Sequence, residues 1–266
     1  MSILKNKKDL VLTGLLTLVV LGSVLIILQM RSLTAEMRSI LNKHPERQMQ
    51  SSALETRDPL YYEKKVARED SARFANANLQ SVQSFVDRNA QLAFSIEQAR
   101  GNGLFCEFGV FTGATINFIA SRTKAKVHGF DSFEGLPEKW REGFDKSSFQ
   151  MNGLPRVQEN VILHKGWFDQ SVPVFAAQYR DSIAFMHMDA DLYSSTKTVF
   201  DLLGNRIVSG TVIVFDELLN YPGWQNGEFR AFQELVQQRH LKFDYIGRVP
   251  NAGQVAVKIA GIHSPE

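Results

Sequence analysis

Leu104-Phe-Cys-Glu-Phe-Gly-Val-Phe-Thr-Gly113 is the most informative segment of the chain for its fold. Residues 104–108 form an apolar run interrupted only by Glu107, which predicts a buried strand, and Gly109 and Gly113 bracket a tight turn after it. Residues 114–121 then predict a helix whose first backbone N–H groups face the turn. Two interpretations of the glycines stay open: they let the backbone approach a nucleotide-type ligand, or they allow the strand and helix to pack closely.

The composition is that of an ordinary folded protein. The chain has 266 residues, of which 44% are hydrophobic and 22% charged, enough for one sizeable domain and an appendage. Its formal charge of +2 is not concentrated in a basic face, so we expect no nucleic-acid partner. The one cysteine, Cys106, lies inside the apolar strand, so we expect a buried structural thiol rather than a disulfide or a nucleophile.

An apolar segment near the N-terminus predicts a membrane anchor. Residues 10–28 contain no charged side chain and are long enough to cross about 30 Å of hydrocarbon as a helix. Lys5, Lys7 and Lys8 resemble the n-region of a signal peptide, but the apolar run is longer than an h-region and no good cleavage site follows it. We therefore expect an uncleaved single-pass anchor at residues 1–30.

The rest of the chain divides into a stalk or linker and a folded domain. Residues 31–60 are polar, with a weak apolar spacing that fits a helical stalk as well as a flexible tether. Residues 61–266 form the predicted domain. Its first part, residues 61–100, has helix-compatible apolar spacing that stops at the following glycines, and these helices are expected to cover the first strand.

Apolar runs alternate with helical segments after the opening stretch, which predicts an α/β fold with a Rossmann-like, doubly wound, mostly parallel sheet. The predicted strands are residues 104–108, 126–130, 161–164, 183–188 and 211–215, followed by a C-terminal antiparallel hairpin of 243–249 and 254–259. Asp131, Asp189 and Asp216 directly follow three of these strands. A single Asp there is usually a helix cap or turn residue, but the carboxyl ends of parallel strands meet at one edge, so recurring acids favour a shared ligand crevice.

The spacing of two acids indicates the kind of ligand. Asp131 lies twenty-four residues after Glu107, at the end of the next predicted strand, where a carboxylate can accept hydrogen bonds from ribose hydroxyls. The turn lacks the Gly-x-Gly-x-x-Gly pattern of dinucleotide sites and the Gly-Lys-Ser/Thr of a P-loop. We therefore expect an adenosine-type ligand.

Three segments together resemble the class I S-adenosylmethionine methyltransferases. They are Glu107-Phe-Gly-Val-Phe-Thr-Gly113, Gly129-Phe-Asp-Ser-Phe-Glu-Gly-Leu-Pro137 and Asp189-Ala-Asp-Leu-Tyr-Ser-Ser-Thr196. The likeness is greatest to the macrocin O-methyltransferase type, which modifies sugar hydroxyls in bacterial natural products. It covers about residues 79–259, with the second segment as its most specific part, and does not include the anchor or the stalk.

By that resemblance, the first two strand ends bind S-adenosylmethionine. The implied cofactor-binding residues are Glu107, Gly109 and Gly113 around the amino-acid end, Asp131 at the ribose, and Ser132 and Phe133 around the adenine.

The same family is similar to catechol-type methyltransferases, which place a magnesium ion between two strand ends. Carried over, the implied ligands are Asp189, Asp216 and Glu217, with Asp191 in reserve. Carboxylate oxygens suit Mg²⁺, and a dication lowers the pKa of a substrate hydroxyl that it binds.

The general base is less clear, because the position of the lysine base in catechol-type enzymes is Leu192 here. The candidate catalytic residues are Asp189, Asp191 and His187, with Tyr193 as a further candidate base. His187 lies in the middle of an apolar strand, a position that also fits a packed core residue.

The predicted function is that of a membrane-anchored, Mg-assisted O-methyltransferase acting on a hydroxyl of a sugar or another small-molecule or glycan acceptor. Asp189-Ala-Asp191 after an anchor also fits a metal-dependent glycosyltransferase, although that alternative does not account for residues 107–113. A non-catalytic scaffold on a methyltransferase fold is a third interpretation. The loop at residues 221–228, rich in Gly, Pro and aromatic side chains, fits either a lid over the acceptor or a well-packed turn.

Cellular location and assembly are only weakly constrained. Basic residues flank the apolar segment on both sides in similar number, so charge does not decide its orientation. Use of a cytosolic cofactor would place the catalytic domain on the cytoplasmic side of the membrane. The oligomeric state stays open, with a homodimer as one option.

Overall fold

A computed structural model describes residues 59–99 and 101–262 of the chain. The chain divides into two units, Met1–Tyr62 and Glu63–Glu266, and the fold below is that of the second. The predicted anchor, residues 1–30, and nearly all of the predicted stalk, 31–60, lie outside the described residues. Within the described ranges, no helix has the length and apolar character needed to span a bilayer.

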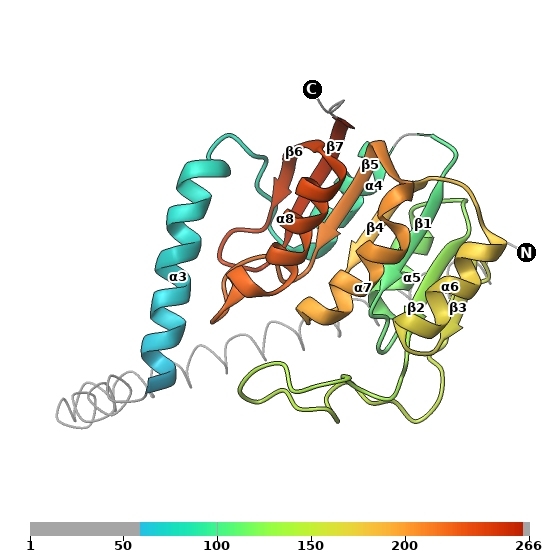
Figure 1. Cartoon of the computed structure of the whole chain (residues 1–266), viewed down its shortest axis with the longest axis horizontal. Coiled ribbons are helices and arrows are strands. Elements are labelled where there is room, and N and C mark those ends of the chain that lie inside the picture. Colours follow the sequence, from blue (N-terminus) through green and yellow to red (C-terminus); the bar gives the residue numbers. More distant parts are fainter. Residues whose placement is uncertain (1–58, 100, 263–266) are drawn as a thin grey trace, which may run out of the picture. The chain divides into compact units, whose positions relative to one another are not determined.

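A seven-stranded mixed sheet forms the centre of the domain (Figure 1). The strand order is β3-β2-β1-β4-β5-β7-β6; the first five strands in the sequence are parallel, and β7 pairs antiparallel with both β5 and β6. The strands are β1 (Leu104–Phe108), β2 (Val127–Asp131), β3 (Val161–Lys165), β4 (Ile183–Met188), β5 (Ile207–Phe215), β6 (Leu241–Arg248) and β7 (Val255–Ile262). The predicted α/β class, mostly parallel sheet and C-terminal hairpin are thus confirmed.

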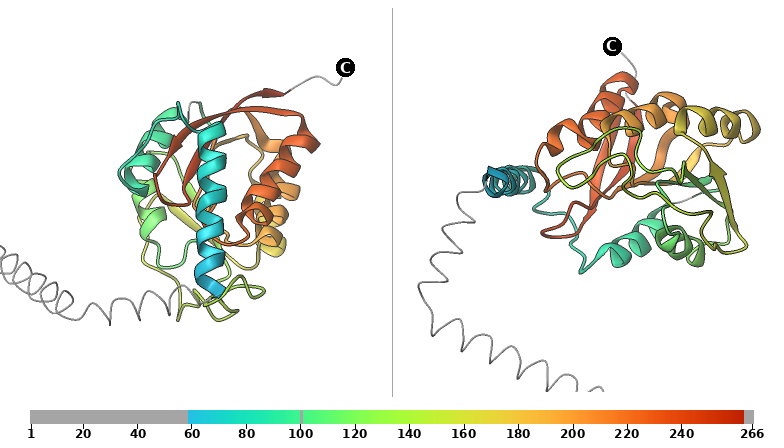
Figure 2. Two further views of the ribbon diagram at one scale, coloured as in Figure 1. Left: turned by 90° about the vertical axis from the view of Figure 1, so that its left-hand side faces the viewer. Right: turned by 90° about the horizontal axis from the view of Figure 1, so that it is seen from below.

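Helices cover both faces of this sheet (Figure 2). On one face lie α4 (Arg88–Gln98) and α5 (Ala114–Ser121); on the other lie α6 (Phe168–Gln178), α7 (Tyr193–Leu203) and α8 (Glu228–Arg239). Two short 3-10 helices, η1 (Gly204–Arg206) and η2 (Trp224–Asn226), precede β5 and α8. Helix α3 (Pro59–Asn78) packs its Phe74 edge-on against Trp224 and Tyr245, so it lies beside the β6 edge.

The central strands are apolar because helices bury both of their sides. Every residue of β1 and β4 is buried, and the faces of the sheet carry two separate hydrophobic clusters. Phe108 stacks on Phe130 of the neighbouring strand with ring centroids 4.8 Å apart. Full burial of each phenylalanine side chain stabilises the folded state by about 1.5–3 kcal/mol. The two polar exceptions in β1 and β4 are Glu107 and His187.

The local chemistry at the ends of the elements explains where they stop. Asp87 caps α4 by accepting a hydrogen bond from the backbone N–H of Ala90. Helix α8 ends at His240, which takes up a left-handed conformation with φ 52°. The predicted helical region at residues 61–100 consists of two helices, because the chain between them extends and Ser84 bridges to Arg248 at the end of β6.

Candidate active site

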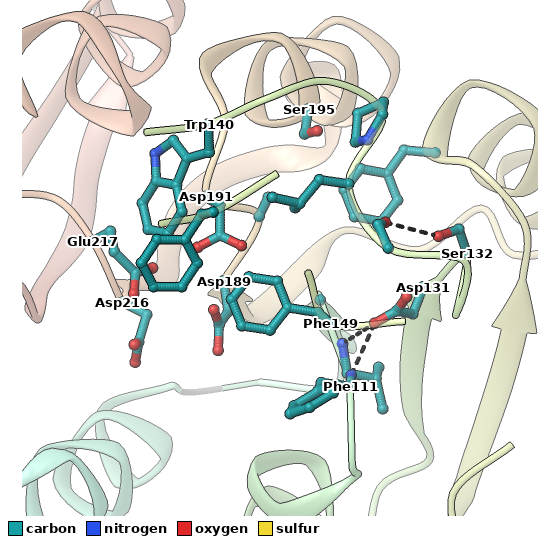
Figure 3. A pocket seen from close by; sticks show the side chains of 18 of the residues that line it. Phe111, Asp131, Ser132, Trp140, Phe149, Asp189, Asp191, Ser195, Asp216 and Glu217 are labelled. Carbon is teal, nitrogen blue, oxygen red and sulfur yellow. Dashed lines mark hydrogen bonds between the residues drawn. The ribbon is translucent and has the colours of Figure 1, made fainter. Parts of the chain in front are cut away.

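A cavity of about 840 Å³ lies at the carboxyl ends of the parallel strands. It is lined by the turn after β1, the end of β2, the acidic residues after β4 and β5, and the long loop between β2 and β3. Because β2 and β4 flank β1 on opposite sides, the strand order reverses here, and ligands of open α/β sheets bind at such a switch point. In Figure 3, Asp131 and Ser132 lie on one side of the cavity and the other acids on the opposite side.

Asp131 organises the turn after β1. Its carboxylate accepts hydrogen bonds from the backbone N–H groups of Val110 and Phe111, each 2.8 Å, and of Phe133, 2.7 Å (Figure 3). A carboxylate has about four acceptor sites, so one stays free for a hydroxyl group in the cavity. Asp131, which was predicted to contact a ribose, therefore also stabilises the conformation of the turn after β1.

The two glycines of the turn are required for packing. Gly109 has φ 92°, and a Cβ atom there would lie 1.8 Å from the backbone oxygen of Asp189. Gly113 has φ 81° and begins α5 in a left-handed conformation; a Cβ atom there would lie 3.1 Å from Pro155. The glycines were interpreted either as allowing close approach to a ligand or as allowing close packing, and close packing explains Gly109. Gly109 also lines the cavity, whereas Gly113 does not.

Two further residues predicted to bind the cofactor, Glu107 and Phe133, do not line the cavity. Glu107 is fully buried and forms a 2.9 Å hydrogen bond with Nδ1 of His187. Phe133 packs in the hydrophobic cluster on the α4–α5 face. Neither residue lines the cavity, whereas Ser132 does; its hydroxyl donates to the carbonyl of Gly135 at 3.2 Å.

The predicted magnesium ligands belong to two overlapping groups that share Asp189. In the first group, donor atoms of His187, Asp189 and Asp216 all lie within 4.8 Å of one another; in the second, those of Asp189, Asp191 and Glu217 do. Asp216 and Glu217 follow β5 directly, as Asp189 follows β4. The register of the parallel strands β4 and β5 therefore brings these acids together (Figure 3).

Burial sets most of the pKa values in this acidic cluster. It raises the pKa of Asp189 and Glu217 well above their usual range, and that of Asp191 to about 7 against the opposing charge of Arg141. Burial alone would also raise the pKa of Asp216, but the hydrogen bond and charge of His187, with the charge of Arg88, hold it well below its usual range. The cavity therefore contains more carboxylates than cations to balance them.

His187, which was predicted as a candidate catalytic residue, interacts with two acidic side chains. It is fully buried, bonded to Glu107, and its Nε2 lies 3.6 Å from Asp216 Oδ1. Burial opposes its charged form, but the hydrogen bonds with Asp216 and Glu107 raise its pKa to about 10. Because His187 does not line the cavity, a catalytic role for it stays a prediction.

The other two candidate bases differ in position. Tyr193 donates its hydroxyl to Glu234 at 2.8 Å and does not line the cavity. Asp191 does line it, in a left-handed conformation with φ 61° that a non-glycine residue rarely adopts (Figure 3). Such strain is typical of functional sites, so Asp191 is the candidate base that the geometry retains.

Sequence reasoning missed Arg88 and Glu228, as well as Arg141, which lines the cavity. Nη1 of Arg88 lies 3.2 Å from Asp216 Oδ1 and 3.8 Å from Asp189 Oδ2. Arg88 begins α4 about a hundred residues before these acids, in a segment without a motif. Glu228 is fully buried, and its Oε1 accepts a hydrogen bond from the backbone N–H of Ala190 at 3.2 Å. Glu228 lies in the first turn of α8, where an acidic residue is commonly explained by a favourable interaction with the helix dipole. Its place in the sequence therefore did not indicate a role in the site.

The loop at residues 221–228 is a packed turn rather than a lid. Trp224 is only 3% exposed and packs against Phe74 and Phe229. The wall of the cavity comes instead from the β2–β3 loop, residues 132–160, whose Trp140 and Phe149 face the acids (Figure 3).

Comparison with known proteins supports the class that the geometry defines. Residues 106–218 match a family described as a methyltransferase domain. CalS11, a calicheamicin methyltransferase, aligns over 81% of this chain and 92% of its own, with 20% identity and a TM-score of 0.53. The O-methyltransferase NovP aligns over 65% and 79%, with 20% identity and a TM-score of 0.51. No curated protein matches the sequence.

The strand order, the turn bound to Asp131 and the cavity at the switch point define a class I methyltransferase fold. The family match places residues 106–218, which include the turn after β1, Asp131 and Asp189, in a methyltransferase domain. The predicted resemblance is confirmed. Because this domain includes Asp189 and Asp191, their Asp-x-Asp spacing belongs to a methyltransferase and not to a glycosyltransferase.

Proposed function

We propose that the protein transfers the methyl group of S-adenosylmethionine to a hydroxyl of a sugar or another small-molecule or glycan acceptor. One observation carries this proposal: the acids after β4 and β5 share a single cavity with the Asp131 turn. An oxygen nucleophile needs a group that takes its proton and groups that orient it, and carboxylates can do both. CalS11 and NovP, which share the fold, are named as a methyltransferase and an O-methyltransferase, in keeping with this chemistry.

The two sides of the cavity have different tasks. Asp131 and Ser132 would hold the adenosine part of the cofactor, and the acids lie on the opposite side of the same cavity. Asp191 accepts the proton of the acceptor hydroxyl, because it is the candidate base that lines this space. When bound, S-adenosylmethionine would supply the methyl group to the acceptor oxygen and leave as S-adenosylhomocysteine. Aromatic residues of the β2–β3 loop exclude water from this transfer.

The donor set fits a magnesium ion. Asp189 and Asp216 offer carboxylate oxygens within 4.8 Å of each other, as do Asp189 and Glu217, and Glu217 Oε2 is buried without a hydrogen-bond partner. Asp189 belongs to both groups and would be a ligand in either arrangement, with Asp216 or Glu217 as a further ligand. When bound, the ion lowers the pKa of the acceptor hydroxyl and fixes its orientation. Arg88 must release Asp216 before that residue can serve as a ligand.

A membrane tether completes the proposal. The uncharged segment at residues 10–28 anchors the protein by one helix, and the catalytic domain lies on the cytoplasmic side, where S-adenosylmethionine is available. The anchor keeps the enzyme near acceptors at the membrane surface.

Turnover tests the function directly. Full-length protein in detergent is incubated with S-adenosylmethionine, MgCl₂ and a panel of glycosides and catechols, and S-adenosylhomocysteine release is measured. We expect release with at least one hydroxylated acceptor. Cofactor binding without release from any acceptor would favour a non-catalytic scaffold instead.

A further inference from the structure

Arg141 is held inside the cavity by aromatic rings. Its guanidinium carbon lies 4.0 Å from the ring centroid of Trp140, 4.7 Å from that of Phe144 and 5.4 Å from that of Tyr221. Arg141 and Trp140 both line the cavity. Stacking of this kind covers the faces of the planar guanidinium and leaves its N–H groups at the edge. The rings therefore fix the orientation of a cation without using its donors.

The donors of Arg141 have no partner among the described residues. No side-chain hydrogen bond or ion pair links Arg141 to that part of the chain, and its Nε is buried without a partner. Other arginines near the sheet are bound: Arg88 to Asp216, and Arg206 to the backbone oxygens of Tyr179 and Ala176. An unpaired buried donor costs about 1–3 kcal/mol. A ligand that accepts these hydrogen bonds would remove the cost.

Neutralising the negative charge of the acidic cluster does not by itself explain the position of Arg141. Arg141 and Asp191 line the same cavity, yet no hydrogen bond or ion pair joins these two described residues. A guanidinium that merely neutralised Asp191 would gain by contacting it, as Arg88 contacts Asp216.

We propose that Arg141 binds an anionic group of the acceptor, a phosphate or a carboxylate, so that the substrate is an acidic sugar derivative. This rests on the proposed methyl transfer to a sugar hydroxyl. The planar fork of a guanidinium matches both anions with two parallel hydrogen bonds. Trp140 offers an aromatic face on which the apolar side of a sugar ring packs. In a cavity otherwise rich in carboxylates, removal of this cation disfavours an acidic acceptor far more than a neutral one.

The first test uses simple anions, which need no knowledge of the acceptor. Full-length protein saturated with S-adenosylhomocysteine is titrated with inorganic phosphate and with acetate, and the side-chain Nε–H NMR signals of arginine are followed. We expect the Arg141 signal, assigned by its loss in R141Q, to shift saturably with a Kd of about 1–10 mM for at least one anion. No saturable shift with either anion would overturn the proposal.

Arg122 provides a matched control, because it also stacks on an aromatic ring, 5.0 Å from that of Phe118, but does not line the cavity. Its signal should not move, and R122Q should leave the titration unchanged. R141K should retain part of the binding, and R141Q should lose it while its affinity for S-adenosylhomocysteine stays the same. Equal effects of R122Q and R141Q would mean that the shifts report nonspecific ion binding.

A second comparison distinguishes the two anions. Binding of hexose 1-phosphates and of hexuronates is measured against the parent neutral hexoses, by calorimetry on the same protein. We expect one acidic series to bind at least about tenfold more tightly than its neutral parent, and R141Q to remove that preference. Equal binding of acidic and neutral sugars would contradict the proposal while leaving methyl transfer intact. Failure to bind S-adenosylhomocysteine would instead contradict the proposed function.

Discussion

Asp189 is expected to take part in methyl transfer without contributing to cofactor binding. It lines the acidic side of the cavity and belongs to both potential metal groups, whereas Asp131 lies on the cofactor side. We expect Asp189→Asn to lower turnover by at least about 100-fold and to change S-adenosylmethionine affinity less than threefold. Product release and calorimetry measure the two quantities. Asp201→Asn, on the exposed side of α7, is the control. Equal loss of turnover and affinity would show that this division of roles is wrong.

Glu107 and His187 form a buried hydrogen-bonded pair. Burial raises the pKa of Glu107; it opposes the charged form of His187, but the hydrogen bonds with Asp216 and Glu107 raise the pKa of His187. We expect the pair to be charged. Removal of one partner leaves an uncompensated buried charge, which is more costly than loss of the pair. We expect Glu107→Gln to lower the free energy of unfolding by about 3–5 kcal/mol, and the further change His187→Gln to restore part of it. Urea unfolding measures both. Glu97→Gln, at an exposed position of α4, should have almost no effect, and a similarly small effect of Glu107→Gln would argue against a charged pair.

Helix α4 contributes a cation to the site from outside the matched methyltransferase segment. Because Arg88 contacts Asp216 and Asp189, it competes with a divalent ion for the same oxygens. We expect Arg88→Gln to increase Mn²⁺ affinity about three- to tenfold, as measured by electron paramagnetic resonance of the free ion. Arg73→Gln, which removes an exposed ion pair in α3, is the control. Weaker Mn²⁺ binding by Arg88→Gln would show that the arginine supports the metal site.

The pairing of β2 with β3 places two histidines in contact. His128 Nδ1 lies 3.0 Å from His164 Nε2, and burial together with the charge of His164 lowers the pKa of His128 to about 4. The folded protein therefore binds fewer protons than the unfolded chain between about pH 6.5 and pH 4, so its stability should fall as the pH falls through that window.

Urea unfolding at several pH values checks this expectation. The slope of unfolding free energy against pH should become smaller in His128→Leu. His240→Asn replaces an exposed histidine at the end of α8 and should keep the slope of the unaltered protein. An unchanged slope in His128→Leu would assign the pH dependence to other groups.

At the scale of the whole molecule, the anchor and the catalytic domain should be separable. We expect the full chain to stay in the membrane fraction after alkaline carbonate extraction, and a variant lacking residues 1–30 to become soluble and still bind S-adenosylmethionine. Cell fractionation and calorimetry measure these outcomes. Release of the full chain by carbonate would exclude a membrane-spanning anchor.

Much of the fold could be predicted because it depends on local sequence patterns, which are formed by residues close together in the chain. The limits predicted for β1, α5 and β4 agree with the structure, since continuous apolar runs that end at Gly or Asp are the local signature of buried parallel strands. The predicted start of β5 was wrong by four residues. A register shift interrupts its pairing with β4, and Gly210, with φ 93°, lies in the irregular part.

Local sequence patterns were enough to predict the class of fold, the glycine turn and the acids at the strand ends, because parallel strands bring their carboxyl ends to one edge of the sheet. Which side chains face the cavity depends instead on long-range packing in the folded domain. It turned Glu107 towards His187, packed Phe133 and Trp224 into the hydrophobic clusters, and brought Arg88 and Arg141 to the acids. The physical reason is that these contacts join residues far apart in the chain, and their strength depends on burial, which local sequence patterns do not encode.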